Sequence, residues 1–177
     1  MLYKATESIP DSTELWLALA KLESYENARV VLNKAREHLP TDHTIWINAA
    51  KLEEAQGNII QVEKIVSRAI KKLSTHGVKI KRGIWIKEAT LAEESGSIIT
   101  CRAIIKETMD YGMDEYFEST SSTEKERVKV MKRVWIENAE ACVAQNSIET
   151  ARALYFNAIR LHPHKKSLWF NAIKLEE

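Results

Sequence analysis

The chain has 177 residues, of which 45% are hydrophobic and 29% are charged, and its formal net charge is +1. This composition excludes a chain that is disordered throughout, and the small net charge excludes a strong overall attraction to nucleic acid or to an acidic membrane. Five glycines and three prolines supply few turns for an all-β fold, so we expect a helical protein.

Neither the cysteines nor the N-terminus indicates export. Cys101 and Cys142 form no CxxC pair and no disulfide-dense pattern, so a reducing compartment is the simpler expectation. No signal-peptide pattern opens the chain, and no stretch approaches the roughly 18 uninterrupted apolar residues of a membrane span. We therefore expect a soluble intracellular protein.

Five tryptophans mark an internal repeat. Each is the first residue of a similar sequence motif. An alanine, or once an isoleucine, follows four residues later, and a leucine, or once an alanine, follows six residues later. This spacing within two helical turns predicts the first helix of a repeated pair. The predicted repeat core consists of Trp16, Trp46, Trp85, Trp135, Trp169, Ala20, Ala50, Ala89 and Ala139.

The residues between these phrases predict the second helix of each pair. Gly57, Gly96 and Asn146 suit the left-handed conformation that closes the first helix. The next residues are Asn58, Ser97 and Ser147, whose side chains we expect to cap the second helix. The second helix ends at a proline in three places, Pro10, Pro40 and Pro163, each six residues before a tryptophan.

These signals predict one array and its boundaries. The expected parts are the end of a preceding second helix (1–10), repeat 1 (11–40), repeat 2 (41–74), repeat 3 (75–113), an insertion plus repeat 4 (114–163) and the first helix of repeat 5 (164–177). Repeat 1 is about one helical turn shorter than the others. We expect residues 114–122 to be mobile and 123–133 to extend the first helix of repeat 4 backwards. Both ends look cut from a longer array, so self-association through them is expected.

The repeated motif resembles the HAT (half-a-TPR) repeat. It consists of Trp, Ala four residues later and then Leu-Glu, followed by Ala-Arg in the second helix and Pro after that helix. A plain tetratricopeptide has Gly where this chain has Ala four times and Ile once. The resemblance implies an all-α, right-handed superhelical solenoid of antiparallel helix pairs. It also implies a nuclear scaffold of RNA processing. We expect neither enzyme activity nor a cofactor, because the sequence contains no nucleophile elbow, phosphate loop or metal-ligand spacing.

The run ELWLALAKLESYENARVVLNKAREHLPTDHTIWINAAKLEEAQGN is similar to one splicing branch of the HAT family. That branch connects the U5 particle with the U4/U6 particle in the tri-snRNP, so the resemblance implies snRNP proteins of both particles as partners. Two alternatives remain open. One is a HAT scaffold of cleavage/polyadenylation or ribosomal RNA processing, and the other is an array that binds RNA directly.

Three groups of residues permit a functional and a structural interpretation. The tryptophans suit RNA-base stacking or core packing, and their regular position favours the core. The pairs Glu53-Glu54, Glu93-Glu94 and Glu176-Glu177 suit acid/base catalysis, but their recurrence favours a solvated face or contacts between repeats. His38, His162 and His164 lack metal-ligand spacing, so we expect no metal site.

A run of cations before the later first helices gives the candidate binding site. The stretches before the first two tryptophans are acidic, with Asp11, Glu14 and Asp42, whereas the later ones are basic. Cations near a helix N-terminus oppose the helix dipole, so local stability does not explain them. We expect a basic edge that faces RNA phosphate or an acidic protein segment, with simple solvation as the alternative. Its residues are Lys79, Lys81, Arg82, Lys129, Lys132, Arg133, Lys165 and Lys166.

Overall fold

The computed structural model describes residues 2–117 and 123–177, and its regular secondary structure in these ranges is entirely helical. The chain divides into two compact units, residues 1–79 and 80–177. The first unit contains α1 (Leu2–Ser8), α2 (Thr13–Leu22), α3 (Tyr25–His38), α4 (His43–Ala55) and α5 (Ile59–Thr75). The second contains α6 (Arg82–Glu94), α7 (Ile98–Thr108), the 3₁₀ helix η1 (Asp114–Tyr116), α8 (Glu124–Ala144), α9 (Ile148–Leu161) and α10 (Lys166–Glu176).

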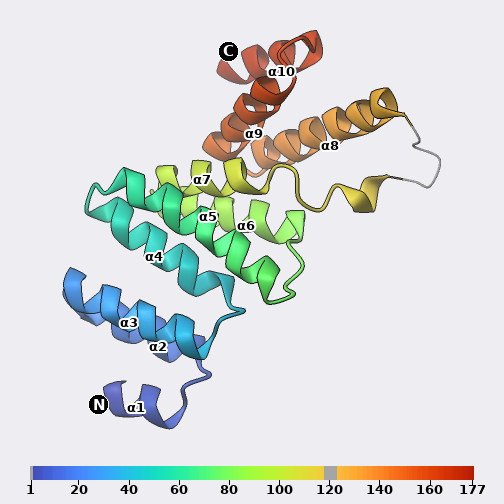
Figure 1. Ribbon diagram of the computed structural model, residues 1–177. Coiled ribbons are helices and arrows are strands. Elements are labelled where there is room, and N and C mark those ends of the chain that lie inside the picture. Colours follow the sequence, from blue (N-terminus) through green and yellow to red (C-terminus); the bar gives the residue numbers. More distant parts are fainter. Residues whose placement is uncertain (1, 118–122) are drawn as a thin grey trace. The chain divides into compact units, whose positions relative to one another are not determined.

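Within each unit, consecutive helices pack as antiparallel pairs (Figure 1). The pairs are α2 with α3 and α4 with α5 in the first unit, and α6 with α7 and α8 with α9 in the second. Neighbouring pairs are joined by packing of α3 on α4 and of α7 on α9. The predicted all-helical class and the pairing are therefore confirmed, while the right-handed twist and the repeat boundaries stay predictions.

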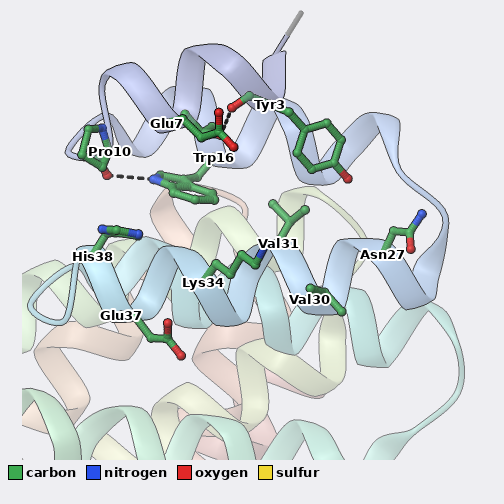
Figure 2. A pocket seen from close by; sticks show the side chains of 11 residues that line it. Tyr3, Glu7, Pro10, Trp16, Asn27, Val30, Val31, Lys34, Glu37 and His38 are labelled. Atoms are coloured by element: carbon green, nitrogen blue, oxygen red, sulfur yellow. Dashed lines mark hydrogen bonds between the residues drawn. The ribbon is translucent and has the colours of Figure 1, made fainter.

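Helix α1 packs against α2 of the first helix pair (Figure 2). Pro10 follows the end of α1, and its carbonyl accepts a hydrogen bond of 2.8 Å from Nε1 of Trp16 on α2. Pro163, which precedes α10, accepts the same bond from Trp169 at 2.9 Å. The proline that ends one helix thus also positions the tryptophan of the next one.

The first helix of three pairs ends in the left-handed turn that the sequence predicts. Gly57 has a φ of +77°, Gly96 of +79° and Asn146 of +61°. At the first of these turns, the backbone N–H of Asn58 donates to the carbonyl of Glu53 over 2.9 Å, which satisfies a carbonyl at the helix end. Such a turn lets the next helix begin at once and run back along the first.

The predicted caps after these turns differ from the structure. Asn58, Ser97 and Ser147 stand at N-cap positions, but none of their side chains accepts a hydrogen bond from its own helix. At α9, a carboxylate from α6 accepts the backbone N–H groups instead, so the serine has no such role there. Side-chain capping occurs at other helices, through Ser12, Asp42 and Thr123.

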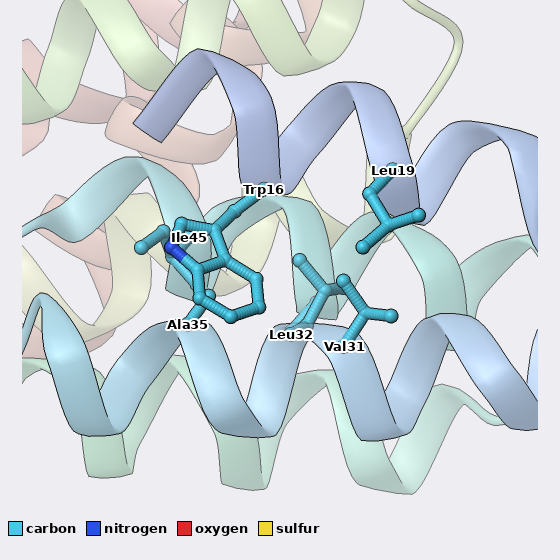
Figure 3. Close-up of a cluster of buried hydrophobic side chains, with 7 residues drawn as sticks. Trp16, Leu19, Val31, Leu32, Ala35 and Ile45 are labelled. Carbon is cyan, nitrogen blue, oxygen red and sulfur yellow. The ribbon is translucent and has the colours of Figure 1, made fainter. Parts of the chain in front are cut away.

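The core of the first unit forms where α2, α3 and α4 meet (Figure 3). Trp16 and Leu19 from α2 contact aliphatic residues of α3, and Ile45 closes the cluster from α4. Ala35 is completely buried there, and its small side chain allows the helices to approach closely. Burial of this apolar stripe stabilises the stack more than helix propensity does.

The long connection before the fourth pair is partly as predicted. Residues 114–117 include the short helix η1, whereas residues 118–122, the rest of the segment expected to be mobile, lie outside the described residues. Helix α8 begins at Glu124, well before Trp135. The backbone N–H of Glu126, in its first turn, donates to the Thr123 hydroxyl over 3.3 Å. The predicted backward extension of this helix is confirmed.

Candidate functional site

Four of the five repeat tryptophans lie in the core. Trp16, Trp46, Trp85 and Trp135 expose between 0% and 8% of their surface, whereas Trp169 on α10 exposes 48%. The alanines at the shared position are fully buried in three repeats, Ala50, Ala89 and Ala139, and Ala20 is half-buried. The four buried indoles therefore offer no exposed ring for stacking on RNA bases.

The histidines at the ends of the second helices pack against these indoles. His38 stacks on Trp16 with ring centroids 5.6 Å apart, and His162 lies 5.5 Å from Trp135. His164 is exposed. In residues 2–117 and 123–177, no group of three or more His, Cys, Asp or Glu side chains is placed to hold a metal ion.

Both cysteines are buried and neutral at physiological pH. Burial raises the pKa of Cys101 and that of Cys142 to about 11. Cys101 lies 3.3 Å from the Thr150 hydroxyl, measured from Sγ to Oγ1, and so contributes to packing between α7 and α9. A thiol that stays protonated is a poor nucleophile, which gives these residues a structural role.

Glu53, the first residue of one carboxylate pair, joins neighbouring helix pairs. Its side chain is almost fully buried and accepts hydrogen bonds from the Tyr25 hydroxyl at 2.8 Å and from Asn58 Nδ2 at 2.8 Å. Arg29 Nε lies 3.1 Å from its other oxygen. The bond to Glu53 also raises the pKa of Tyr25. Because both carboxylate oxygens are engaged by the protein, this residue stabilises the stack.

The other two carboxylate pairs make similar contacts. Glu93 on α6 accepts the backbone N–H groups of Glu149 and Thr150, each at 2.8 Å, and thereby caps α9. Glu176 on α10 binds the guanidinium of Arg152 on α9 through two hydrogen bonds, of 2.6 and 2.8 Å. The first glutamate of each pair therefore makes contacts between repeats and is more than part of a solvated face. The particular partners were not predicted, although Glu53 follows Arg29 at the same sequence spacing as Glu176 follows Arg152.

Most residues of the predicted basic edge are exposed, but they lie on separate elements. Lys79 belongs to the first unit, and Lys81 stands at the N-cap of α6 in the second. Lys165 and Lys166 open α10 and are both exposed. The remaining cations, apart from Arg82, are Lys129, Lys132 and Arg133 in the N-terminal half of α8. The structure gathers these three on one helix.

Arg82 differs from the prediction because its side chain is buried and bound within the second unit. Only 6% of its surface is exposed, Nη1 donates to the Met109 carbonyl over 2.7 Å, and Nε donates to Asn138 Oδ1 over 3.1 Å. Burial lowers its pKa to about 10, so it remains charged at neutral pH. The backbone at Gly112 passes so close to Arg82 that a Cβ there would lie 3.1 Å from its backbone nitrogen. Arg82 therefore holds the connection after α7 in place and contributes nothing to an exposed edge.

Among the predicted cations, those in the N-terminal half of α8 form the most strongly basic helical surface. Lys125, Lys129 and Lys132 recur at intervals of four and three residues, which places them on one helix face. Arg133 is adjacent and forms an exposed ion pair of 3.7 Å with Glu137. Lys129, Lys132 and Arg133 border a hollow of about 710 Å³ together with Val130 and Ile136, and the carboxylates Glu126 and Glu137 line it as well, so cations exceed acids there by one. The arrangement suits an anionic partner that runs along the helix.

A second surface feature, which sequence analysis did not predict, is a groove of about 510 Å³ between α1 and α3. Its floor is apolar, with Trp16 and Val31, and charged side chains stand on both walls (Figure 2). The lining residues are Tyr3, Thr6, Glu7, Pro10, Trp16, Asn27, Val30, Val31, Lys34, Glu37 and His38. We name it the α1–α3 groove.

Comparison with known proteins identifies relatives over most of the chain. It is 49% identical to pre-mRNA-processing factor 6 of Homo sapiens over 119 residues, which is 67% of the chain. The chain resembles pre-mRNA-processing factor 6. It is equally similar, at 49% identity over 65% of the chain, to pre-mRNA-processing factor 6 of Pongo abelii. Pre-mRNA-splicing factor prp1 of Schizosaccharomyces pombe is 41% identical over 161 residues, which is 91% of the chain. The predicted resemblance to a splicing branch is thus confirmed.

The match covers only part of these relatives. The chain spans 11% of each pre-mRNA-processing factor 6 sequence and 16% of prp1. No protein-family model matches it. In the described part of the chain, no helix combines the length and the apolar composition that crossing a membrane requires.

Proposed function

We propose that the chain is a protein-binding scaffold segment in pre-mRNA splicing that helps to bridge the U5 and U4/U6 particles of the tri-snRNP. The similarity to pre-mRNA-processing factor 6, at 49% identity over 67% of the chain, is the observation that carries this proposal. The partners are snRNP proteins of the two particles, and the site of action is the nucleus. The alignment with prp1, a splicing factor by name, over 91% of the chain supports the same role.

The mechanism that we propose is geometric and involves no catalysis. Within each unit, stacked helix pairs present long surfaces on which a partner is held by many weak contacts. Arg29 with Glu53, and Arg152 with Glu176, fix one pair on the next. A firmly joined stack loses little conformational entropy when a partner binds, which favours a scaffold.

The main alternative is a HAT-repeat scaffold of another RNA-processing pathway. The experiment that separates the two is affinity purification of the full-length protein from nuclear extract, followed by sequencing of the RNAs that co-purify. The splicing proposal predicts enrichment of the U5, U4 and U6 RNAs together. Enrichment of ribosomal RNA precursors, or of polyadenylation substrates without these three RNAs, would assign the chain to the other pathway.

As a second function, we propose that the basic face of α8 contacts RNA directly. Within residues 2–117 and 123–177, Lys129 and Lys132 form no ion pair, so neither ammonium group is held by a carboxylate of the chain. Lysines on one helix face place their ammonium groups along a line, which suits successive phosphates of a single strand. Lys81, Lys165 and Lys166 are further exposed cations of the second unit.

Self-association is the remaining expectation that we retain as a proposal. Helix α10 exposes 69% of Phe170 and 55% of Ile173, next to the half-exposed Trp169. In the other repeats, the position of Ile173 is a fully buried alanine or, in repeat 1, a half-buried one. An apolar helix face of this kind favours association of the chain with itself at high concentration.

A further inference from the structure

Helix α5, labelled in Figure 1, is the most basic of the second helices α3, α5, α7 and α9. It carries four cations against one carboxylate, an excess of three. The counts are three against two in α3 and two against one in each of α7 and α9, an excess of one. The whole chain has a net charge of +1, so all residues outside α5 sum to −2. The positive charge of the chain is therefore concentrated on this helix.

The four cations of α5 lie on its solvent-exposed face. Lys64, Arg68 and Lys71 recur at intervals of four and three residues, and Lys72 follows Arg68 by four. All four side chains are exposed. Ile60, four residues before Lys64, continues the line at its N-terminal end and exposes 72% of its surface. We name these five residues the α5 stripe.

None of the four cations of the α5 stripe forms an ion pair within residues 2–117 and 123–177. The other second helices differ, because Arg29 in α3, Arg102 in α7 and Arg152 in α9 each pair with a glutamate. The one carboxylate of α5, Glu63, directly precedes Lys64 in the sequence, so it points about 100° away around the helix. The stripe itself is thus free of acidic residues.

The stability of α5 does not account for this arrangement. Lys71 and Lys72 are close to the C-terminus of the helix, where the helix dipole favours cations. Lys64 and Arg68 are too far from that end to benefit. Instead, the spacing of four residues from Lys64 to Arg68 and from Arg68 to Lys72 brings like charges together, which destabilises a helix.

Helix α3 adds a fifth cation beside the stripe. The Cζ atom of Arg36 lies 4.5 Å from the centroid of the Trp46 ring, so a cation–π contact holds this guanidinium in place. Burial and the charge of Arg68 both lower the pKa of Arg36, which means that the two guanidinium groups are close enough to repel each other. Glu37, the residue after Arg36, lines the α1–α3 groove instead.

The side chains of the stripe are suited to an acidic protein helix rather than to RNA. Single-stranded RNA is bound by cations together with aromatic rings that stack on its bases, and α5 contains no aromatic residue. The stripe instead combines the aliphatic Ile60 with cations four, eight and eleven residues further on. A partner helix with carboxylates at the same spacing and an aliphatic side chain at one end complements this pattern.

We propose that the α5 stripe binds an acidic helix of a partner protein, whose carboxylates contact Lys64, Arg68 and Lys71 and whose aliphatic side chain contacts Ile60. The partner supplies the negative charge that this face of α5 lacks, so binding relieves the repulsion among the cations. This inference rests on the proposed scaffold function, in which a partner is held along a helical surface. It adds the surface and the chemistry of the segment that binds there.

The direct test is an NMR titration of the ¹⁵N-labelled 177-residue chain with two synthetic helical peptides. The acidic peptide repeats the sequence Glu-Ala-Leu-Glu, and the neutral peptide has glutamine in place of every glutamate. At low salt, the acidic peptide is expected to shift the amides of α5 in a saturable way, with a Kd of about 0.1 mM. The neutral peptide should bind at least about tenfold more weakly, and added salt should weaken only the acidic peptide.

A double variant and a matched control locate the binding surface. Lys64→Gln combined with Arg68→Gln should weaken binding of the acidic peptide about tenfold. Its melting temperature should not fall, because both residues are exposed and their like charges repel each other. Lys129→Gln combined with Lys132→Gln removes the same charge from α8 and should leave the affinity unchanged. Equal binding of the two peptides, shifts outside α5, or equal losses in the two double variants would each overturn the proposal.

A uridine oligonucleotide serves as the probe for RNA at the same surface. We expect it to bind the Lys64 and Arg68 double variant as it binds the unaltered chain, and a loss confined to this variant would assign the α5 stripe to RNA and overturn the proposal. Failure of the acidic peptide to bind would refute the α5 stripe even if the U5, U4 and U6 RNAs co-purify with the full-length protein. Absence of these RNAs would refute the splicing role and leave peptide binding at α5 intact.

Discussion

Arg29 on α3 and Glu53 on α4 form an ion pair in which Nε lies 3.1 Å from Oε1. At the same sequence spacing, Arg152 on α9 and Glu176 on α10 form a two-pronged pair. In both cases the arginine belongs to the second helix of one pair and the glutamate to the first helix of the next. This contact fixes how successive helix pairs stack, and the predictions below begin with it.

Glu53→Gln is expected to destabilise the chain by about 2 kcal/mol. The neutral amide loses the charge-assisted contact with Arg29 and cannot accept all the hydrogen bonds that now converge on the buried carboxylate. Urea unfolding followed by far-ultraviolet circular dichroism measures the change. Glu26→Gln is the control, because it removes the exposed partner of the same arginine, at 3.8 Å, and should cost less than about 0.5 kcal/mol. Equal effects of the two changes would contradict a special role of Glu53.

Trp135→Ala is expected to cost about 4 kcal/mol, because it leaves a large cavity at a fully buried position. Trp169→Ala removes the same ring at a half-exposed position, where we expect a loss of about 1 kcal/mol. Thermal and urea unfolding of the two variants measure the difference. A loss below about 1 kcal/mol for Trp135→Ala would refute the proposed packing role of the repeat tryptophans.

Asp42 is expected to make stability depend on pH in the acid range. Burial alone would raise its pKa, but hydrogen bonds from Thr13 and Thr44 outweigh this effect, so the pKa is lower than in the unfolded chain. The carboxylate therefore stabilises the fold above its ordinary pKa, and this contribution is lost as the pH falls through the folded value. Asp42→Asn should lower the melting temperature at pH 7 and show a smaller further decrease between pH 5 and about pH 3 than the unaltered chain. The exposed Asp11→Asn serves as the control and should follow the unaltered chain.

Replacing Lys129 and Lys132 by Gln is expected to weaken binding of single-stranded RNA. Each phosphate contact adds about 0.7 to the slope of log affinity against log salt, so the double variant should lose about 1.4 from that slope. Filter binding of a uridine oligonucleotide across a salt series measures it. The matched control changes Lys71 and Lys72 on α5, which alters the net charge equally. An identical slope in the unaltered chain, the variant and the control would contradict RNA binding at the basic face of α8 and would favour a merely solvated surface.

The sequence predicted best the features that depend on neighbouring residues. Pro10, Pro40 and Pro163 follow the ends of α1, α3 and α9, and Gly57 and Gly96 adopt the left-handed turns after α4 and α6. These positions were predictable because backbone sterics restrict proline locally and because glycine tolerates a positive φ. The tryptophan spacing likewise indicated the first helix of each pair.

Features that depend on distant residues were not predicted. Arg82 was assigned to an exposed edge because its neighbours in sequence are cationic, but the connection at Met109 and Gly112 returns to cover it. The serine at the start of α9 was expected to cap that helix, and Glu93, far away in the sequence, caps it instead. The α1–α3 groove is lined by residues of α1 and α3, two helices that α2 separates in the sequence. Such contacts arise from tertiary packing, which residue spacing does not encode.

The most direct test of the proposed splicing role is to replace the matching segment of Schizosaccharomyces pombe prp1 with this chain, since the two align over 161 residues. The measurement is the ratio of spliced to unspliced transcripts in cells that have the chimera as their only prp1. We predict that the chimera supports growth and intron removal. A chimera that accumulates to normal abundance but leaves introns unspliced would contradict the proposed role.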